Sequence, residues 1–275
     1  MAAIRMVYVM SLRNAAADRA GQYIEFKGGV RYVRSPLEHL VRTLNEGALG
    51  QQVSLEGVFF DDDRGNERDR RQLTGYGFGP EAADRWFYPR DLHAQGRDVN
   101  GLLRNIPSDY RRLPLGDERR ASGKRDFEMR LKAAMDEARA DVVVLDGLLV
   151  ILDALIQPFS SYHRRIYNIH PGITREGSPW QRRGAHATLD ALYGARGEKV
   201  VDWNTMEKVR VPVVGRTGAS FHYVDGGIDS GEVVFDVLGT DIDPEDTILE
   251  LRWKNFNCSL FPALIGGLER VVAGP

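Results

Sequence analysis

The chain has few cysteines and no long apolar runs. Cys258 is the only cysteine among 275 residues, so the chain can form neither an internal disulfide nor a cysteine-rich zinc site. No stretch approaches the roughly 18 consecutive apolar residues of a membrane-spanning helix, and the apolar run within residues 1–10 is too short for a signal peptide. We therefore expect a soluble, cytoplasmic protein with no membrane partner.

Neither sign of charge is in excess. The 37 Lys and Arg residues nearly balance the 39 Asp and Glu residues, for a formal net charge of -2, which disfavours a nucleic-acid partner. Basic residues cluster in residues 64–71 and 111–125, but acids are interleaved with them, and we interpret both segments as solvated faces. Asp61, Asp62 and Asp63 have no neighbours that could complete a metal shell, so we interpret them as a solvated turn and predict no metal site.

Glycine is missing from residues 11–17, which follow the first predicted strand at residues 6–10. A dinucleotide or phosphate site at a first strand–helix junction needs glycines so that backbone N–H groups can approach the phosphate. The sequence therefore argues against NAD, and against a phosphate-bearing substrate, at this position. Residues 75–80 are rich in glycine but lack the Lys-Ser/Thr of a phosphate loop. We interpret them as a flexible loop, followed by a short strand at residues 86–88.

Strand and helix signals alternate along the chain, which predicts an α/β fold with a mostly parallel sheet flanked by helices. Ser35, Pro36 and Glu38 supply the N-cap, the first-turn proline and the capping-box acid of a helix that ends at Gly47. The other predicted elements are strands at residues 53–60, 141–145 and 165–169, helices at 124–140 and 185–193, and a hairpin at 18–34.

The last third of the chain predicts an antiparallel extension and a long helix. Strands are expected at residues 209–213, 220–224 and 232–238, and the helix at residues 243–272 begins at Asp243 and is kinked or divided by Pro262. We treat residues 1–275 as a single domain. Within it we distinguish an insertion-rich region at residues 61–123, a catalytic core at 124–238 and the C-terminal helix.

Asn168 and His170 stand two residues apart at the end of a predicted strand, so their side chains share one face. Pro171 and Gly172 then end the strand and leave the imidazole at its mouth. An amide donor beside a titratable imidazole suits reactions in which negative charge develops on a carbonyl oxygen. A lone Asn or His at a strand end is nevertheless more often a turn former or a satisfied core residue.

Three separated motifs resolve this choice. A Gly-x-x-x-Ile-Leu loop at residues 147–152, Asn168-Ile169-His170-Pro171 and an Asp-x-x-x-Asp-x-Gly segment at residues 225–231 occur in this order across residues 141–238, which resembles the formyltransferases that use 10-formyltetrahydrofolate. Gly184-Ala185-His186 also matches the Gly-x-His of that family. The resemblance implies a Rossmann-like formyltransferase fold, 10-formyltetrahydrofolate as co-substrate, and no metal. It also implies catalytic roles for Asn168, His170 and Asp229. The folate-binding residues that it implies are Leu149, Val150 and Leu152 in one loop and Asp225, Gly226 and Ile228 in another.

The chemistry of these side chains agrees with formyl transfer to an amine. Asn168 and a charged His170 can donate hydrogen bonds to the formyl oxygen as it gains negative charge. We expect Asp229 to raise the pKa of His170, keep it charged near neutral pH, and accept or relay the proton of the nucleophile.

Departures from the family pattern reduce the range of acceptor substrates that we expect. The missing glycine loop disfavours glycinamide ribonucleotide, and the net charge disfavours tRNA. The resemblance is strongest to members that formylate N5-hydroxyornithine in pyoverdine siderophore biosynthesis, whose hydroxylamine nitrogen is neutral at pH 7. The alternatives are another small amine, such as a nucleotide-linked amino sugar, or a non-catalytic folate-binding module. We expect a monomer or weak dimer. Candidate residues for the acceptor are Gln181, Arg182, Arg183 and His186.

Overall fold

The computed structural model describes residues 3–75 and 89–274. The predicted strand at residues 86–88, and all of the predicted glycine-rich loop except Gly75, lie outside these ranges. The described residues group into two compact units, one of residues 3–22 and 32–167 and the other of residues 23–31 and 168–274. Each unit is described by itself below.

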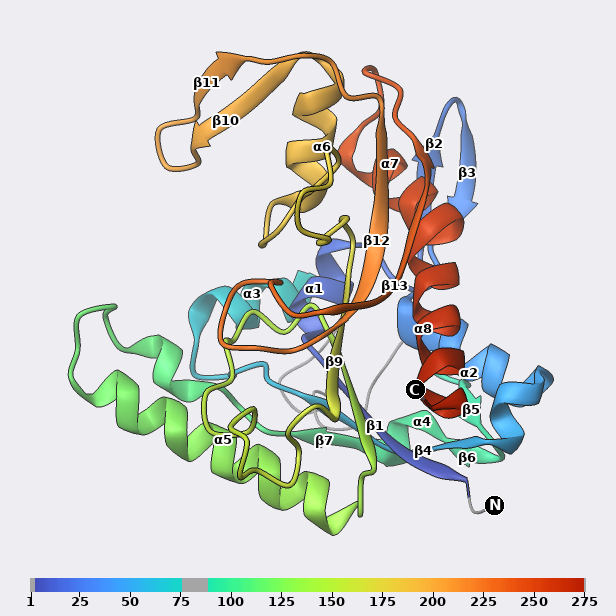
Figure 1. Cartoon of the computed structure of the whole chain (residues 1–275), viewed down its shortest axis with the longest axis vertical. Coiled ribbons are helices and arrows are strands. Elements are labelled where there is room, and N and C mark those ends of the chain that lie inside the picture. The colour runs from blue at the N-terminus through green and yellow to red at the C-terminus, as the bar shows by residue number, and fades with distance from the viewer. Residues whose placement is uncertain (1–2, 76–88, 275) are drawn as a thin grey trace. The chain divides into compact units, whose positions relative to one another are not determined.

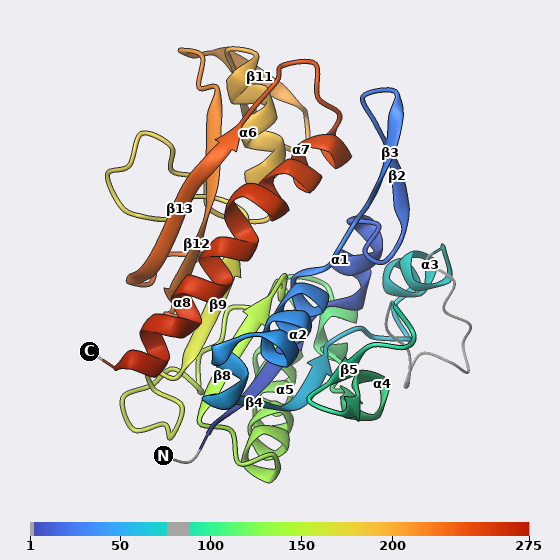
Figure 2. The same cartoon turned by 90° about the vertical axis from the view of Figure 1, so that its right-hand side faces the viewer.

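The first unit contains a parallel sheet in the order β8-β1-β4-β7. Helices α2 (Pro36–Glu46) and α5 (Arg119–Glu137) lie on opposite sides of these strands (Figure 2). The strands are covered on both faces, and side chains such as Tyr8 and Val143 are therefore fully buried. The predicted α/β class and parallel sheet are confirmed. The strand bounds are β1 (Ile4–Met10), β4 (Val53–Phe60), β7 (Leu103–Asn105) and β8 (Val142–Asp146).

Helix α2 begins and ends where the sequence predicts. The Ser35 hydroxyl accepts from the Glu38 N–H at 2.9 Å, Pro36 occupies the first turn, and Gly47 is the C-cap. The predicted capping box is only half formed, because the Glu38 carboxylate accepts instead from the guanidinium of Arg42 at 2.8 Å and from the hydroxyl of Tyr32 at 2.9 Å. A buried carboxylate needs such donors, and the guanidinium also supplies an opposite charge.

The insertion-rich region contributes a strand to the sheet. β7 pairs in parallel with β4, although three residues are too few to show a periodic pattern in the sequence. Ala94 and Val99 in the same region are fully buried. The other elements of this region are α3 (Glu67–Gly75), β5 (His93–Ala94), β6 (Arg97–Asp98), α4 (Val99–Leu102) and the short 3-10 helix η2 (Asp109–Arg112).

The interpretation of Asp61, Asp62 and Asp63 as a solvated turn is wrong, because each is only 1% exposed. The Arg13 guanidinium lies 2.9 Å from Asp61, and Asp62 accepts from the backbone N–H groups of Leu12 and Arg13 at 2.7 and 2.9 Å, at the start of α1 (Leu12–Ala17). Burial raises the pKa of Asp62 to about 6, with Asp61 adding to the rise.

Arg111 joins the same cluster, so the interpretation of residues 111–125 as a solvated face fails there. Its guanidinium lies 2.6 Å from Asp69. Asp69 is buried as well, and it also lies 3.6 Å from the guanidinium of Arg13. The cluster therefore links β4, α1, α3 and η2 through charges that alternate in sign, as burial of several ions requires.

The second unit is built on antiparallel strands β12 (Arg216–Tyr223) and β13 (Val233–Asp241). The strand order is β13-β12-β9, and residues 168–170 of β9 (Ile166–His170) belong to this unit. Helix α8 (Phe261–Ala273) lies along β12 and β13 (Figures 1 and 2). Close packing is possible because Gly267 carries no side chain: a Cβ there would lie 2.3 Å from the ring of Phe221. The predicted antiparallel extension is confirmed.

The C-terminal helical segment starts later than predicted. Helix α7 (Ile248–Asn255) begins after Thr247, whose hydroxyl accepts from the Glu250 N–H while the Glu250 carboxylate accepts from the Thr247 N–H. Asp243 instead closes a turn with Asp246. A π-helical turn (Phe256–Leu260), which exposes Cys258, separates α7 from α8, and Pro262 occupies the first turn of α8. The predicted division at Pro262 is confirmed.

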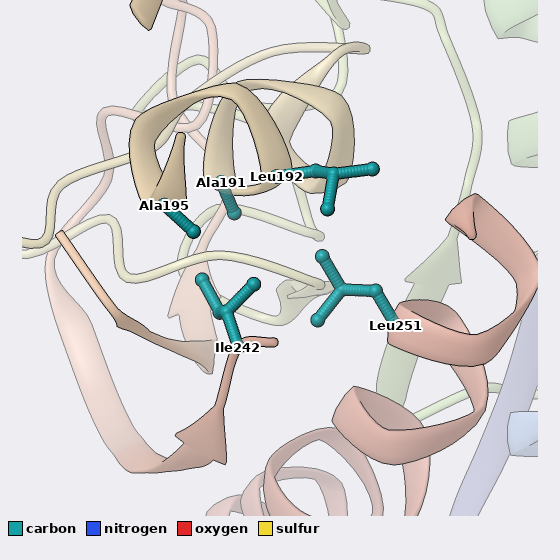
Figure 3. Close-up of a cluster of buried hydrophobic side chains, with 5 residues drawn as sticks. All are labelled: Ala191, Leu192, Ala195, Ile242 and Leu251. Atoms are coloured by element: carbon teal, nitrogen blue, oxygen red, sulfur yellow. The ribbon is translucent and has the colours of Figure 1, made fainter. Parts of the chain in front are cut away.

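Helix α6 (Ala187–Ala195) is fixed by a small apolar cluster (Figure 3). Ala191, Leu192 and Ala195 face Ile242, just beyond β13, and Leu251 of α7. The helix passes through Gly194, where the sequence predicts its end, and ends at Ala195, two residues before Gly197, which lies in the left-handed region (φ +70°). The unit is completed by a hairpin of β10 (Glu198–Asp202) and β11 (Glu207–Arg210), and by the predicted N-terminal hairpin of β2 (Tyr23–Phe26) and β3 (Gly29–Tyr32). Across residues 3–75 and 89–274, none of the helices combines the length and the apolar character needed to span a bilayer.

Candidate active site

Asn168, His170 and Asp229 come together in the second unit, as the sequence predicts. The Asn168 side-chain amide donates to Asp229 Oδ1 at 3.0 Å, and His170 Nδ1 lies 3.3 Å from Asp229 Oδ2. Asn168 and His170 are the third and last residues of β9, so the strand's period places both on the face that meets the turn bearing Asp229. One carboxylate therefore contacts both strand-end side chains.

Asp229 is held from several sides. The backbone N–H of Gly184, just before α6, donates to its Oδ2 at 2.8 Å. Its own backbone lies in the left-handed region (φ +47°), which Asp tolerates better than most residues. Burial alone would raise the pKa of Asp229, but contacts with His222 and His170 and the Gly184 N–H hold that pKa well below its usual range. Asp229 is therefore a carboxylate throughout the physiological pH range.

His222 is a site residue that the sequence does not reveal. It is 2% exposed on β12, and its Nε2 lies 3.5 Å from Asp229 Oδ1 and 3.3 Å from the Asn168 amide nitrogen. Its Nδ1 lies 2.8 Å from the Tyr223 carbonyl oxygen, which can only accept, so Nδ1 carries a proton. The available signal was a titratable side chain between two aromatic residues of a predicted strand, but pairing of β12 beside β9 is needed to place it.

The structure reverses the predicted direction of the His170 pKa. His170 is 6% exposed, and burial lowers its pKa more than Asp229 raises it, with His222 lowering it further. The carbonyl oxygen of Arg182 lies 3.0 Å from His170 Nε2 and, like Asp229, favours the protonated ring. The prediction of an imidazole kept charged near neutral pH is therefore wrong, because the cost of burying the charge is the largest effect. A neutral His170 is available to accept a proton.

The two predicted folate loops lie in different units. In the first unit, residues 147–152 expose Leu149 (56%) and bury Val150 and Leu152. Ile151, which the sequence prediction omitted, is also exposed. In the second unit, Ile228 is 59% exposed, Gly226 is exposed, and Asp225 closes the turn by accepting from the Gly227 N–H at 3.0 Å and the Ser230 hydroxyl at 2.6 Å. Folate binding by these residues stays a prediction.

The four candidate acceptor residues have other partners. Gln181 and Arg183 both donate to the carbonyl oxygen of Thr174, at 3.2 and 2.8 Å. Burial lowers the pKa of Arg182, which donates to the Gln181 carbonyl oxygen at 3.0 Å. His186 is exposed and stacks on Trp203 with ring centroids 4.1 Å apart. These contacts brace the loop before α6, and an acceptor-binding role stays a prediction. The residues that the structure describes contain no group of three or more His, Cys, Asp or Glu placed to hold a metal ion.

Comparison with known proteins found a close relative of known structure, whereas no protein-family model matches the chain. That structure is PvdF of pyoverdin biosynthesis, described as a structurally unique N10-formyltetrahydrofolate-dependent formyltransferase. It is 57% identical, with a TM-score of 0.92, over 99% of this chain and 100% of PvdF.

Two more distant structures share the fold alone. Phosphoribosylglycinamide formyltransferase from Anaplasma phagocytophilum is 15% identical with a TM-score of 0.53, over 99% of this chain and 88% of that one. Glycinamide ribonucleotide transformylase 1 from Symbiobacterium toebii is 14% identical with a TM-score of 0.57, over 99% and 89%. With this fold, and with 57% identity to PvdF over nearly its whole length, the chain belongs to the N10-formyltetrahydrofolate-dependent formyltransferases.

Proposed function

We propose that this protein transfers the formyl group of N10-formyltetrahydrofolate to the hydroxylamine nitrogen of N5-hydroxyornithine in pyoverdine biosynthesis. The observation that carries the proposal is the 57% identity to PvdF across 99% of the chain. The contact of Asn168, His170 and Asp229 supports it, because these groups can stabilise an oxyanion and move a proton.

Asn168 would stabilise the formyl oxygen as the acceptor nitrogen attacks the formyl carbon. Its amide donates one hydrogen to Asp229 Oδ1 at 3.0 Å, and His222 Nε2 lies 3.3 Å from the same amide nitrogen. The contact with Asp229 uses one of the two amide hydrogens, so the other would donate to the developing oxyanion. The contact to Asp229 then keeps the amide in one orientation during the reaction.

His170 would accept the proton that the acceptor nitrogen loses. Its lowered pKa makes the ring neutral at physiological pH, and Asp229 stabilises the imidazolium that forms. The bond from the formyl carbon to N10 then breaks, and the His170 imidazolium gives its proton to N10 as tetrahydrofolate leaves. The neutral hydroxylamine nitrogen needs no prior deprotonation, whereas an alkyl ammonium does.

An acceptor panel tests the substrate. The protein is incubated with N10-formyltetrahydrofolate and N5-hydroxyornithine, ornithine or a nucleotide-linked amino sugar, and release of tetrahydrofolate and formation of an iron-binding hydroxamate are measured. We expect efficient turnover with N5-hydroxyornithine alone. Turnover with the amino sugar and none with N5-hydroxyornithine would overturn the assignment of N5-hydroxyornithine as the acceptor.

A second experiment distinguishes an enzyme from a binding module. His170→Ala should lower kcat by about 10²-fold or more and leave folate affinity within a few fold. Unchanged turnover in this variant would contradict the role of His170 as the proton acceptor.

A further inference from the structure

Residues 147–152 are anchored at both ends by side chains of the first unit. At the start, the Asn14 side-chain amide of α1 donates to the Gly147 carbonyl oxygen. Gly147 lies in the left-handed region (φ +63°), and a Cβ there would lie 2.8 Å from that amide nitrogen. A direct bond of this kind requires the bare backbone of glycine.

At the far end, the Glu128 carboxylate of α5 accepts hydrogen bonds from three successive backbone N–H groups. It accepts from Asp153 at 2.9 Å, from Ala154 at 2.7 Å and from Leu155 at 3.2 Å, and it is only 1% exposed. Hydrogen bonds to a buried carboxylate are stronger than neutral ones, and three convergent donors fix the backbone of all three residues.

The same helix holds Asp153 by its side chain. Lys124 lies one turn before Glu128 on α5, and its Nζ lies 2.5 Å from Asp153 Oδ2. Leu152 and Leu155 are fully buried on either side of this contact. The chain is therefore fixed by burial and by contacts with α5 directly after Ile151.

Between the anchors, the backbone makes no hydrogen bonds to the described residues. Within residues 3–75 and 89–274, no hydrogen bond reaches the N–H or C=O groups of residues 148–152. Backbone polar groups that make no internal bonds must meet water or a ligand. Exposed Leu149 and Ile151 supply apolar surface beside them.

We propose that Glu128 and Asn14 are positioning residues for the folate, which hold residues 147–152 so that their free backbone groups and apolar side chains are preorganised for the pteridine ring. This inference rests on the proposed function. Preorganisation raises affinity because the ordering cost is met before the ligand binds.

Two isosteric variants test the anchors. Glu128→Gln replaces one accepting oxygen with a donor that faces the Asp153 or Ala154 N–H, and Asn14→Asp turns a donor into an acceptor that faces the Gly147 carbonyl oxygen. Each should raise the dissociation constant and the KM for folate about tenfold, with kcat at saturating folate and KM for the acceptor within about twofold. Amide hydrogen exchange should quicken at residues 153–155 in Glu128→Gln without a general increase elsewhere.

Glu137→Gln is the matched control, because Glu137 lies on the same helix with its side chain 71% exposed and pairs with Arg104. Direct titration with tetrahydrofolate tests the proposed function and the anchoring role separately. No binding by the wild-type protein would overturn the proposed function. Binding by the wild-type protein with unchanged affinity in both folded variants would overturn the anchoring role alone.

Discussion

The imidazole of His222 lies 3.5 Å from the Asp229 carboxylate, on the oxygen that does not face His170. Two imidazoles and one amide therefore contact a single carboxylate, and His222 lowers the pKa of His170. The first prediction follows from this coupling.

Replacing His222 with Gln should raise the pKa of His170, because the second imidazole lowers it. The acidic limb of the kcat/KM profile should move to higher pH, and kcat should fall by about tenfold because Asp229 and Asn168 lose an orienting contact. A pH–rate profile and an NMR titration of His170 measure both effects. An unmoved acidic limb would show that the two rings are not coupled.

The wild-type enzyme should lose activity on acidification through protonation of His170. Burial lowers the pKa of His170, so its neutral form persists below the ordinary value of about 6.5. Between pH 6.5 and the lower native pKa, the unfolded chain binds a proton that the native ring does not. The free energy of unfolding therefore decreases as the pH falls through this range. The expected kcat/KM is flat near neutrality and drops only on the acid side of pH 6.5. A midpoint above 6.5 would instead support a charged His170.

Arg13→Ala should destabilise the protein strongly. Removing this guanidinium leaves the buried carboxylates Asp61 and Asp62 short of compensating charge, which typically costs about 3–5 kcal/mol in the free energy of unfolding. Arg71→Ala is the control, because Arg71 pairs with Glu67 on an exposed helix face, where a pair contributes about 0–1 kcal/mol. Urea unfolding at pH 7.5 compares the two variants. Equal losses would contradict the buried network.

Asp146→Asn should stabilise the protein at alkaline pH. Burial raises the pKa of Asp146 to about 7, and the Tyr8 hydroxyl donates to its carboxylate at 2.8 Å. Because the unfolded pKa is near 3.9, stability from this group is lost as the pH rises from about 4 to 7. The Asn variant lacks this titration, so its Tm at pH 8 should exceed that of the wild type by a few degrees, and the difference should vanish near pH 4. Thermal unfolding at both pH values decides the point.

The fold was predictable where local signals suffice. Strand β4 and the start of α2 match their predictions, because an apolar run and a Ser-Pro-x-Glu sequence act through near neighbours. The start of α7 was missed because both Asp243 and Thr247 can begin a helix, and only Thr247 makes the reciprocal bonds with Glu250. Strand β7 was missed because three residues carry no period.

The contact among the three motif residues was predictable, but their electrostatics were not. The order of motifs indicated Asn168, His170 and Asp229, and the structure brings them into contact. The burial that governs the pKa of His170, the approach of His222 and the pairing of Asp61 with Arg13 all arise from segments far apart in the sequence. A carboxylate run looks solvated until its partners are known.

The left-handed backbone of Asp229 limits what evolution or design can place there. The position needs an acceptor for Asn168 and the Gly184 N–H, and also a residue that tolerates φ of +47°. Asn tolerates this backbone conformation but carries no charge, and Gly tolerates it but has no side chain. Glu carries the charge on a longer side chain, but it tolerates a positive φ less well than Asp does. None of these three residues meets both needs as Asp does. Asp229→Asn is therefore the substitution that removes the charge and keeps the backbone conformation.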